Sequence, residues 1–359
     1  MKLYVFNDMS TSKCSEHKSG IYEPKLSHIP VMHGNRSDDS VKLQKPQVCL
    51  GMPLYNQTQF LPEAVSSILA QTYRDFRLLV VDDSTESGPE AIIKQFASRD
   101  NRITYVKNKS RKGLVENWKT CFQQAGNPDY FAWVSDHDVW HPEWLESMIM
   151  AMNANPEAVL VYPRCVHIDL EGQRHPKRRS FVFSTEGMSE AQRIKAVCRD
   201  NARGYGKMIY GLFRAPALRR SGIFRRVLFP DVILMYELCL QGDLIQVDAE
   251  LWYRRGNAAF SIARQKRSLF VRKPWYIMLP WPLVNAAVLA WNTVLQPQEK
   301  NLKYRYRGTQ VALRYLLRQL GRFGKGSWIG SYHEWRHAKK PWIKKLKRRL
   351  KNRRLSKAG

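Results

Sequence analysis

Two acidic clusters in the sequence have the residue types and the placement for metal chemistry. Asp82-Asp83 follows the apolar run FRLLVV, and Asp136-His137-Asp138 follows YFAWVS. Carboxylate oxygens suit Mg²⁺ or Mn²⁺, which bind one or two carboxylates and complete their coordination with phosphate oxygens and water. A single aspartate at a strand end often only makes a turn or caps a helix, so the metal interpretation depends on the two clusters together. We expect His137 to point away from any ligand.

The elements that must position these clusters alternate between strand and helix patterns. Strands are expected at 47–52, 76–81, 103–106, 130–134 and 158–163, and helices at 60–71, 89–97, 114–125 and 142–153. This alternation predicts an α/β fold with right-handed βαβ units and a mainly parallel sheet covered by helices. Ligands of such sheets bind beyond the carboxyl ends of the strands, where both acidic clusters fall.

Beyond residue 163 the alternation becomes less regular. The patterns predict a strand and a short helix within 210–224, a helix at 231–242 and two short strands within 244–255. Several function classes lack their motif: there is no GxGxxG after the first strand, no GxxxxGK[ST] and no GxSxG. The six cysteines show no CxxC spacing, which favours reduced thiols in a cytosol. The N-terminus has no long apolar run, so we do not expect a secretory signal peptide.

An ordered set of motifs resembles family 2 glycosyltransferases, the nucleotide-sugar enzymes of the A-type fold. The matching stretches are VCLGMPLYNQTQFLPEAVSSILAQTYRDFRLLVVDDSTES, WVSDHDVWHPEWL, YGLFRAPALRRSGIF and FPDVILMYELCLQGDLIQVDAELWYRR, in the order and approximate spacing of the family. Together they cover residues 47–256. The resemblance implies a Rossmann-like A-type glycosyltransferase fold and a hexosyltransferase-like, inverting enzyme.

The resemblance also implies roles for individual residues. Asp136 and Asp138 would hold the Mn²⁺ or Mg²⁺ that bridges the diphosphate, and Asp82 would accept a hydrogen bond from the base or ribose. Asp231 would be the general base, with Glu237 as the alternative. Asp231 also fits the N-cap of the helix that it opens. The residues implied to line the nucleotide-sugar site are Pro53, Tyr55, Asn56, Asp82, Asp83, Arg111, Lys112 and Asp136.

The implied reaction is one direct displacement. A carboxylate accepts the proton of an acceptor hydroxyl as that hydroxyl attacks the anomeric carbon of a nucleotide-diphosphate sugar, with UDP-sugars favoured. The metal stabilises the charge on the departing diphosphate. The acceptor would be a glycan or a lipid-linked precursor in cell-surface polysaccharide synthesis. Two other functions stay open: a non-catalytic nucleotide-sugar-binding homologue, and a nucleic-acid-binding protein that acts through a basic tail.

The net charge of +28 is concentrated at one end of the chain. Residues 264–359 contain 25 Lys and Arg but only two acidic residues, Glu299 and Glu334. Charge and pattern therefore divide the chain into a mostly disordered lead-in (1–45), a glycosyltransferase domain (46–263) and a basic helical region (264–359). The domain would consist of a nucleotide-sugar half (46–163) and an acceptor half (164–263).

The basic region predicts contact with an anionic membrane surface rather than with nucleic acid. Residues 275–295 are apolar enough to span a bilayer, but they contain Pro280 and Pro282, so an interfacial segment and a buried helix are both kept open. In the next helix, a face with Arg307, Arg314, Arg318 and Arg322 lies opposite a face with Leu313, Leu316, Leu320 and Phe323. We therefore expect a cytoplasmic protein that is peripheral at the inner face of the membrane.

Overall fold

One eight-stranded sheet organises the computed structural model of the chain, with strand order β3-β2-β1-β4-β7-β6-β8-β5. The structure describes residues 47–175, 181–199, 204–256, 265, 268–295 and 301–321. The strand pairings give β1, β2, β3, β4, β6 and β8 one direction, whereas β5 and β7 run the opposite way. The expected lead-in at 1–45 and the terminal basic segment beyond residue 321 lie outside the described residues.

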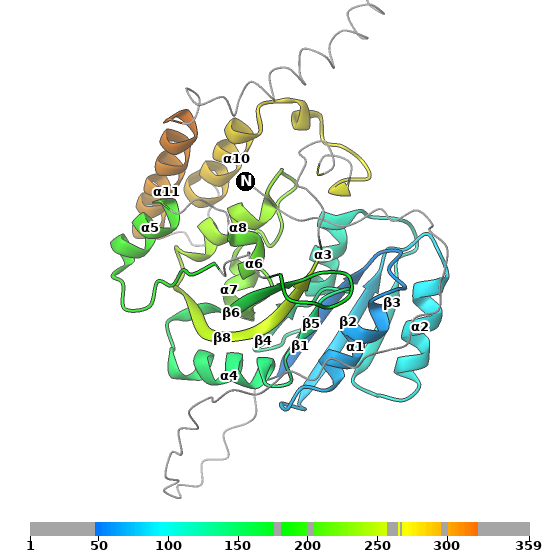
Figure 1. The fold of residues 1–359 in the computed structure, drawn as a ribbon. Coiled ribbons are helices and arrows are strands. Elements are labelled where there is room, and N and C mark those ends of the chain that lie inside the picture. The colour runs from blue at the N-terminus through cyan, green and yellow to red at the C-terminus, as the bar shows by residue number, and fades with distance from the viewer. Residues whose placement is uncertain are drawn as a thin grey trace, which may run out of the picture.

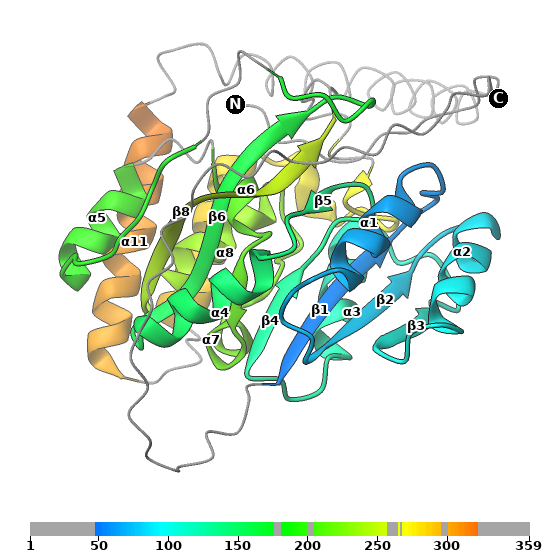
Figure 2. The ribbon, with the colours of Figure 1, turned by 60° about the horizontal axis from the view of Figure 1, so that its bottom comes forward.

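The strands and helices alternate through the first half of the chain, as expected. The strands are β1 (Val48–Leu54), β2 (Phe76–Asp82), β3 (Ile103–Lys107), β4 (Tyr130–Trp133), β5 (Val139–Trp140), β6 (Ala158–Ile168), β7 (Leu212–Arg214) and β8 (Asp243–Arg255). The helices that alternate with them are α1 (Leu61–Leu69), α2 (Gly88–Ala97), α3 (Leu114–Gln123) and α4 (Trp144–Ala154). Figure 2 shows α1 and α4 on one face of the sheet and α3 on the other, which confirms a covered, mainly parallel sheet.

The second half of the chain departs from the sequence prediction at β8. Two short strands were expected within 244–255, but β8 is one strand that pairs with β6 along its length. The register shifts near Pro163 and Arg164, so the alternation of the side chains is interrupted there and imitates two strands. The helices of this half are α5 (Glu190–Arg199), α6 (Tyr205–Met208), α7 (Ala215–Arg220) and α8 (Pro230–Leu238).

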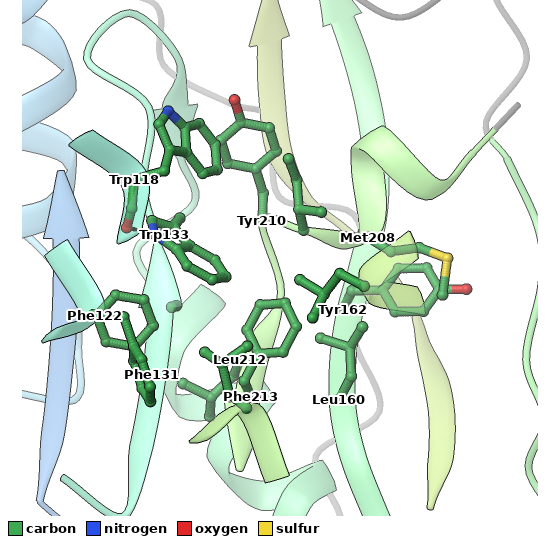
Figure 3. Close-up of a cluster of buried hydrophobic side chains, with 14 of the residues drawn as sticks. Trp118, Phe122, Phe131, Trp133, Leu160, Tyr162, Met208, Tyr210, Leu212 and Phe213 are labelled. Carbon is green, nitrogen blue, oxygen red and sulfur yellow. Dashed lines mark hydrogen bonds between the residues drawn. The ribbon is translucent and has the colours of Figure 1, made fainter. Parts of the chain in front are cut away.

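Aromatic side chains fill the core where β4, β6 and β7 meet (Figure 3). The ring of Trp133 lies 5.6 Å from that of Trp118 and 5.4 Å from that of Phe213, and its indole nitrogen donates to the carbonyl of Trp118. Tyr210 lies beside Trp118 at the edge of this cluster, with its hydroxyl directed away from Trp133 and Phe213. The core therefore holds β4, whose end carries Asp136, against the acceptor half.

The C-terminal helices pack on α5 and α8 (Figure 1). They are the 3₁₀ helix η1 (Trp275–Met278), α10 (Trp281–Ala290), the π-helical turn η2 (Trp291–Leu295) and α11 (Leu302–Gly321). The apolar segment 275–295 is thus interrupted rather than straight, and one side of it is buried. Within the described part of the chain, no helix combines the length and the apolar character that crossing a membrane requires.

The structure shows which face of α11 packs on the protein, a point that the sequence pattern leaves open. Arg307 forms an ion pair with Glu190 of α5, and Arg318 donates to the carbonyl of Cys198, so arginines of the basic face are turned toward the protein. Leu313 and Leu320 are exposed instead. The helical wheel identified the two faces correctly, but α5 supplies hydrogen-bond acceptors that draw the arginines inward, which a wheel cannot show.

Candidate active site

The Asp136-His137-Asp138 cluster lies where β1 and β4 separate, and Asp82-Asp83 lies at the end of β2, on the other side of β1. Strands β1 and β4 pair from Val48–Tyr130 to Gly51–Trp133; beyond this point β4 ends in the 134–138 loop, whereas β1 continues beside β2 as far as Leu54. From β1 the chain continues to β2 and from β4 to β5 and β6, in opposite directions along the sheet, and such a reversal of the strand order leaves a crevice at the carboxyl ends of the strands. The backbone N–H of Tyr55 reaches to 3.5 Å from Oδ2 of Asp136 across this opening. Tyr55 and Asp136, which follow different strands, thus lie side by side at one edge of the sheet.

His137 does not point away from the two carboxylates, contrary to expectation. Its Nδ1 lies 2.6 Å from Oδ1 of Asp136, and its Nε2 lies 3.8 Å from Oδ1 of Asp138. Burial disfavours the imidazolium form, but the neighbouring charges of Asp138 and Asp136 outweigh burial and raise the pKa of His137. The imidazole thus spans the two buried carboxylates, and the hydroxyl of Ser135 lies 3.0 Å from its Nδ1.

Asp138 is held by the end of β8. Its Oδ2 accepts a 3.1 Å hydrogen bond from the indole of Trp252, and its Oδ1 accepts a 2.8 Å bond from the backbone N–H of Arg255. The Arg255 guanidinium also donates to the carbonyl of His137 and pairs with Glu63 of α1 at 2.7 Å. These contacts explain the stretch LWYRR at the end of the matching region: it positions the second aspartate.

Asp82 and Asp83 organise the neighbouring loops. Asp82 accepts bonds of 2.7 Å from each of Tyr105, Lys107 and the N–H of Ser84. Burial alone would raise the pKa of Asp82, but the bonds from Lys107, Ser84 and Tyr105 lower it below its ordinary value. Asp83 accepts bonds from the side chain of Asn108 and from the N–H groups of Lys112 and Gly113. Both carboxylates therefore fix the loops that follow β2 and β3.

The residues implied to line the nucleotide pocket take different positions. The guanidinium of Arg111 lies 4.6 Å above the ring of half-buried Tyr55, a cation–π arrangement. Asn56, with a left-handed φ of 49°, binds the 84–86 loop through its side chain. The ammonium of Lys112 lies 3.2 Å from Thr120 on α3. Pro53 is buried within β1.

The two candidate bases, Asp231 and Glu237, lie on the same helix but differ in their hydrogen bonding. Asp231 is in the first turn of α8 with 2% exposure, and neither carboxylate oxygen has a hydrogen-bond partner among the described residues. Burial raises its pKa to about 7. Glu237 accepts bonds from the N–H of Gly222 at 2.6 Å and from Arg225 at 3.0 Å. Burial raises the pKa of Glu237 as well, against the opposing charge of Arg225.

Because buried Glu237 pairs with half-buried Arg225, we expect Glu237→Gln to destabilise the fold. Removing the carboxylate weakens the acceptor for Arg225 and for the N–H of Gly222, which costs about 1–3 kcal/mol of unfolding free energy. Urea unfolding followed by circular dichroism would measure it. An unfolding midpoint equal to that of the wild type would show that the pair contributes no net stability.

Tyr210 and Arg254 interact electrostatically with both the aspartate loop and Asp231 of α8. Burial raises the pKa of Tyr210, and the charges of Asp138, Asp136 and Asp231 add to this effect. The positive charge of Arg254 acts on Asp231 and on His137 alike. The ring of Tyr210 lies 4.7 Å from that of Trp252, which binds Asp138. The carboxylates of the loop and of α8 thus share one electrostatic neighbourhood.

Sequence reasoning missed Tyr210, Trp252 and Asn117 as site residues. Asn117 of α3 is buried and donates to the carbonyl of Val81 at 3.0 Å, which secures the end of β2. Each of these side chains acts by holding another residue, and such contacts join segments up to about a hundred positions apart. The aromatic-arginine stretch LWYRR was the one signal in the sequence that pointed to Trp252.

Comparison with known proteins agrees with this geometry. Residues 49–213 match the family model "Glycosyl transferase family 2". EpsE of Bacillus subtilis, which is named as a glycosyltransferase, is 33% identical over 105 residues, covering 29% of this chain and 37% of EpsE. An uncharacterised glycosyltransferase of Rickettsia prowazekii is 29% identical over 121 residues, covering 33% and 36% of the two chains. The match thus spans little more than a third of these curated relatives.

The fold also resembles a solved structure. The S. aureus protein TarS, in a crystal structure with UDP-GlcNAc, has a TM-score of 0.54 and 15% identity over 80% of each chain. Sheet order, helix cover and aspartate loop together define an A-type glycosyltransferase fold. The match to the model of glycosyltransferase family 2 extends over residues 49–213, a little under half of the chain. Asp231 and β8 lie beyond the matched residues, so their roles are proposals.

Proposed function

We propose that this protein transfers a hexose from a nucleotide-diphosphate sugar, with a UDP-sugar favoured, to an acceptor hydroxyl with inversion. One observation carries the proposal: Asp136 and Asp138 lie at the opening between β1 and β4, and unpartnered Asp231 lies in the same electrostatic neighbourhood. A donor diphosphate and an acceptor hydroxyl need two such groups of carboxylates, one on each side of the anomeric carbon.

The residues at the opening fit a divalent cation. Asp136 and Asp138 are both buried, and each carboxylate oxygen retains a lone pair beyond its hydrogen bond to the protein. Among the residues with described positions, His, Cys, Asp and Glu form no group of three or more that could enclose a metal. Proteins typically bind Mg²⁺ or Mn²⁺ with one or two carboxylates when diphosphate oxygens supply other ligands of the ion. When bound, the ion would neutralise charge on the departing diphosphate.

Asp231 is the better of the two bases. Its buried oxygens make no hydrogen bond of ordinary geometry to a described residue, although the N–H groups of Asp231 and Val232 lie close enough to lower its pKa, whereas the oxygens of Glu237 are occupied by Gly222 and Arg225. A pKa of about 7 leaves Asp231 largely ionised in mildly alkaline solution and basic enough to receive a proton. Asp231 would take the proton of the hydroxyl as the oxygen bonds to the anomeric carbon.

Tyr55 and Arg111 would bind the nucleotide. The ring of Tyr55 offers a stacking face to a base, and Arg111 already lies on that ring. Asp82 and Asp83 would act mainly by holding the loops around the nucleotide, because their oxygens are engaged by Lys107, Tyr105 and the 112–113 backbone. Direct contact of Asp82 with the base or ribose would use its remaining lone pairs.

Calorimetric titration tests the donor side of this proposal. We expect UDP to bind more tightly than GDP or dTDP in the presence of Mn²⁺ or Mg²⁺, and EDTA to weaken UDP binding strongly because the metal would hold the diphosphate. Release of UDP would then be measured to detect transfer from UDP-sugars to glycan or lipid-linked acceptors. Metal-dependent binding without any transfer would favour a non-catalytic nucleotide-sugar-binding protein. Absence of binding under every metal condition would refute the metal–diphosphate site.

We also propose that the reaction takes place at the cytoplasmic face of a membrane, on a precursor of a cell-surface polysaccharide. The support is the charge of residues 264–359, with 25 basic and two acidic side chains, which suits anionic lipid. The described part of this region is helical and packs against the catalytic domain.

A further inference from the structure

Exposed large apolar side chains are concentrated on the C-terminal helices. Of the thirteen such side chains among the described residues, eleven lie between 271 and 320, and only Met150 and Val182 lie elsewhere. The eleven are Val271, Trp275, Leu279, Leu283, Trp291, Leu295, Leu302, Tyr306, Leu313, Leu317 and Leu320. Large contiguous apolar patches are uncommon on soluble proteins and mark sites of interaction with proteins or membranes.

These side chains form two stripes. The first follows η1, α10 and η2 at a spacing of four residues and includes Trp275, Leu283 and Trp291. The second follows α11 at spacings of three, four and seven residues, from Leu302 to Leu320. These spacings keep the exposed side chains on one side of α11 and of α10 with η2, whereas Trp275 and Leu279, before the break at Leu279–Pro280, are assigned to the first stripe by their exposure. Figure 1 shows α10 and α11 next to each other, which brings the two stripes onto neighbouring helices.

The opposite sides of these helices are already used in packing. Asn285 donates to the carbonyl of Leu228 at 2.9 Å, and the ring of Tyr315 meets that of Tyr236 on α8 at 5.4 Å. A Cβ on Gly308 would come within 2.5 Å of the carbonyl of Thr293, so α11 and η2 are in close contact. The stripes are therefore outer faces of a firmly packed helix pair.

The charges around the stripes suit anionic lipid. Between residues 264 and 321 the sequence contains eleven Lys and Arg and one acidic residue, Glu299. Lys273, Lys303 and Arg314 are exposed beside the stripes. Tryptophan at the polar–apolar boundary, as at 275 and 291, is typical of side chains that lie at the depth of lipid headgroups. A second copy of the chain would bring a region with the same positive charge against this one, which opposes dimerisation through the stripes.

We propose that the outer faces of η1–α10–η2 and α11, defined here as the apolar docking surface, insert into the interface of a bilayer that contains anionic lipid. Binding would combine burial of the leucines and tryptophans with attraction of the flanking cations. The proposal rests on the proposed function only for its purpose, which is to bring the active site to a membrane-embedded acceptor. It differs from purely electrostatic attachment in requiring apolar insertion.

Co-sedimentation with vesicles tests the apolar docking surface. The full chain is mixed with phosphatidylcholine vesicles with and without phosphatidylglycerol, at low and high salt. The test variant carries Leu283→Ser, Trp291→Ser, Leu313→Ser and Leu317→Ser, all on the stripes. The matched control carries Met150→Ser and Val182→Ser, whose side chains are 66% and 68% exposed elsewhere on the molecule. We expect the stripe variant to lose at least about tenfold in partition, while the control partitions like the wild type.

Three results would overturn the proposal. The first is equal partition of stripe variant and wild type, which would assign attachment to basic charge alone, particularly if high salt abolishes it. The second is no partition of the wild type onto either vesicle. The third is a wild-type dimer in solution that the stripe variant converts to a monomer. UDP binding is measured on the same proteins without vesicles. If the wild type partitions onto vesicles as expected but does not bind UDP, only the proposed function is refuted.

Discussion

Asp231→Asn is expected to lower the rate of sugar transfer by about a hundredfold to ten-thousandfold while nucleotide binding is retained. The amide has nearly the shape of the carboxyl group but cannot accept the proton of the acceptor hydroxyl. Because the wild-type carboxyl has a pKa of about 7, kcat/KM of the wild type should rise with pH and level off above that value. Release of UDP as a function of pH, together with UDP calorimetry, measures both properties.

The same substitution should not destabilise the fold. The pKa of Asp231 rises from its ordinary 3.8 to about 7 in the folded state, so between these pH values the folded chain binds a proton that the unfolded chain has released. Stability from this group is therefore complete below pH 3.8 and is lost as the pH rises through 7. At pH 8 the Asp231→Asn protein should equal or exceed the wild type in urea unfolding.

Glu237→Gln is the matched control on the same helix. It should lower stability, because Arg225 loses its partner, but preserve activity per folded molecule. If Glu237→Gln instead abolishes transfer in folded protein while Asp231→Asn leaves it unchanged, Glu237 is the base and the assignment made here is wrong.

Asp136→Asn and Asp138→Asn should each weaken metal-dependent UDP binding by at least about a hundredfold, since both remove a charged oxygen ligand. Asp138→Asn should have an additional structural effect, because an amide nitrogen facing Trp252 would place two donors against each other. Calorimetry with Mn²⁺, with Mg²⁺ and with EDTA separates loss of metal binding from loss of nucleotide binding.

Asp248→Asn is the control for these variants. Asp248 is also on β8, but its side chain is 74% exposed and pairs with Arg164. UDP binding of this variant should equal that of the wild type. Undiminished, EDTA-sensitive binding of UDP by both Asp136→Asn and Asp138→Asn would show that the metal lies elsewhere.

The first half of the fold was predictable from the sequence because each element carries its own periodicity. The strands β1, β2 and β4 are buried on both faces and therefore appear as continuous apolar runs, and the helices between them are amphipathic. The second half depends on contacts between distant segments. The register shifts of β8 against β6 and the short β5 are set by pairing partners, which local patterns do not reveal.

Only part of the site was predictable from local sequence patterns. Asp136 and Asp138 end an apolar strand and were visible as a motif. That His137 would span them, or that Trp252 and Arg255 would hold Asp138, follows from β8 crossing to β5, more than a hundred residues away. The choice between Asp231 and Glu237 needed the structure, because it depends on which carboxylate already has donors around it.

The helix pair α10 and α11 has one more consequence, for orientation. A protein attached to a membrane by a single amphipathic helix can still roll about the axis of that helix. Two stripes on neighbouring helices prevent this rotation, because both must stay in contact with the membrane at the same time. α10 packs on the segment that leads into α8, where the ring of Trp281 lies 4.6 Å from that of Phe229. The orientation of Asp231 relative to the bilayer plane would therefore be fixed as well.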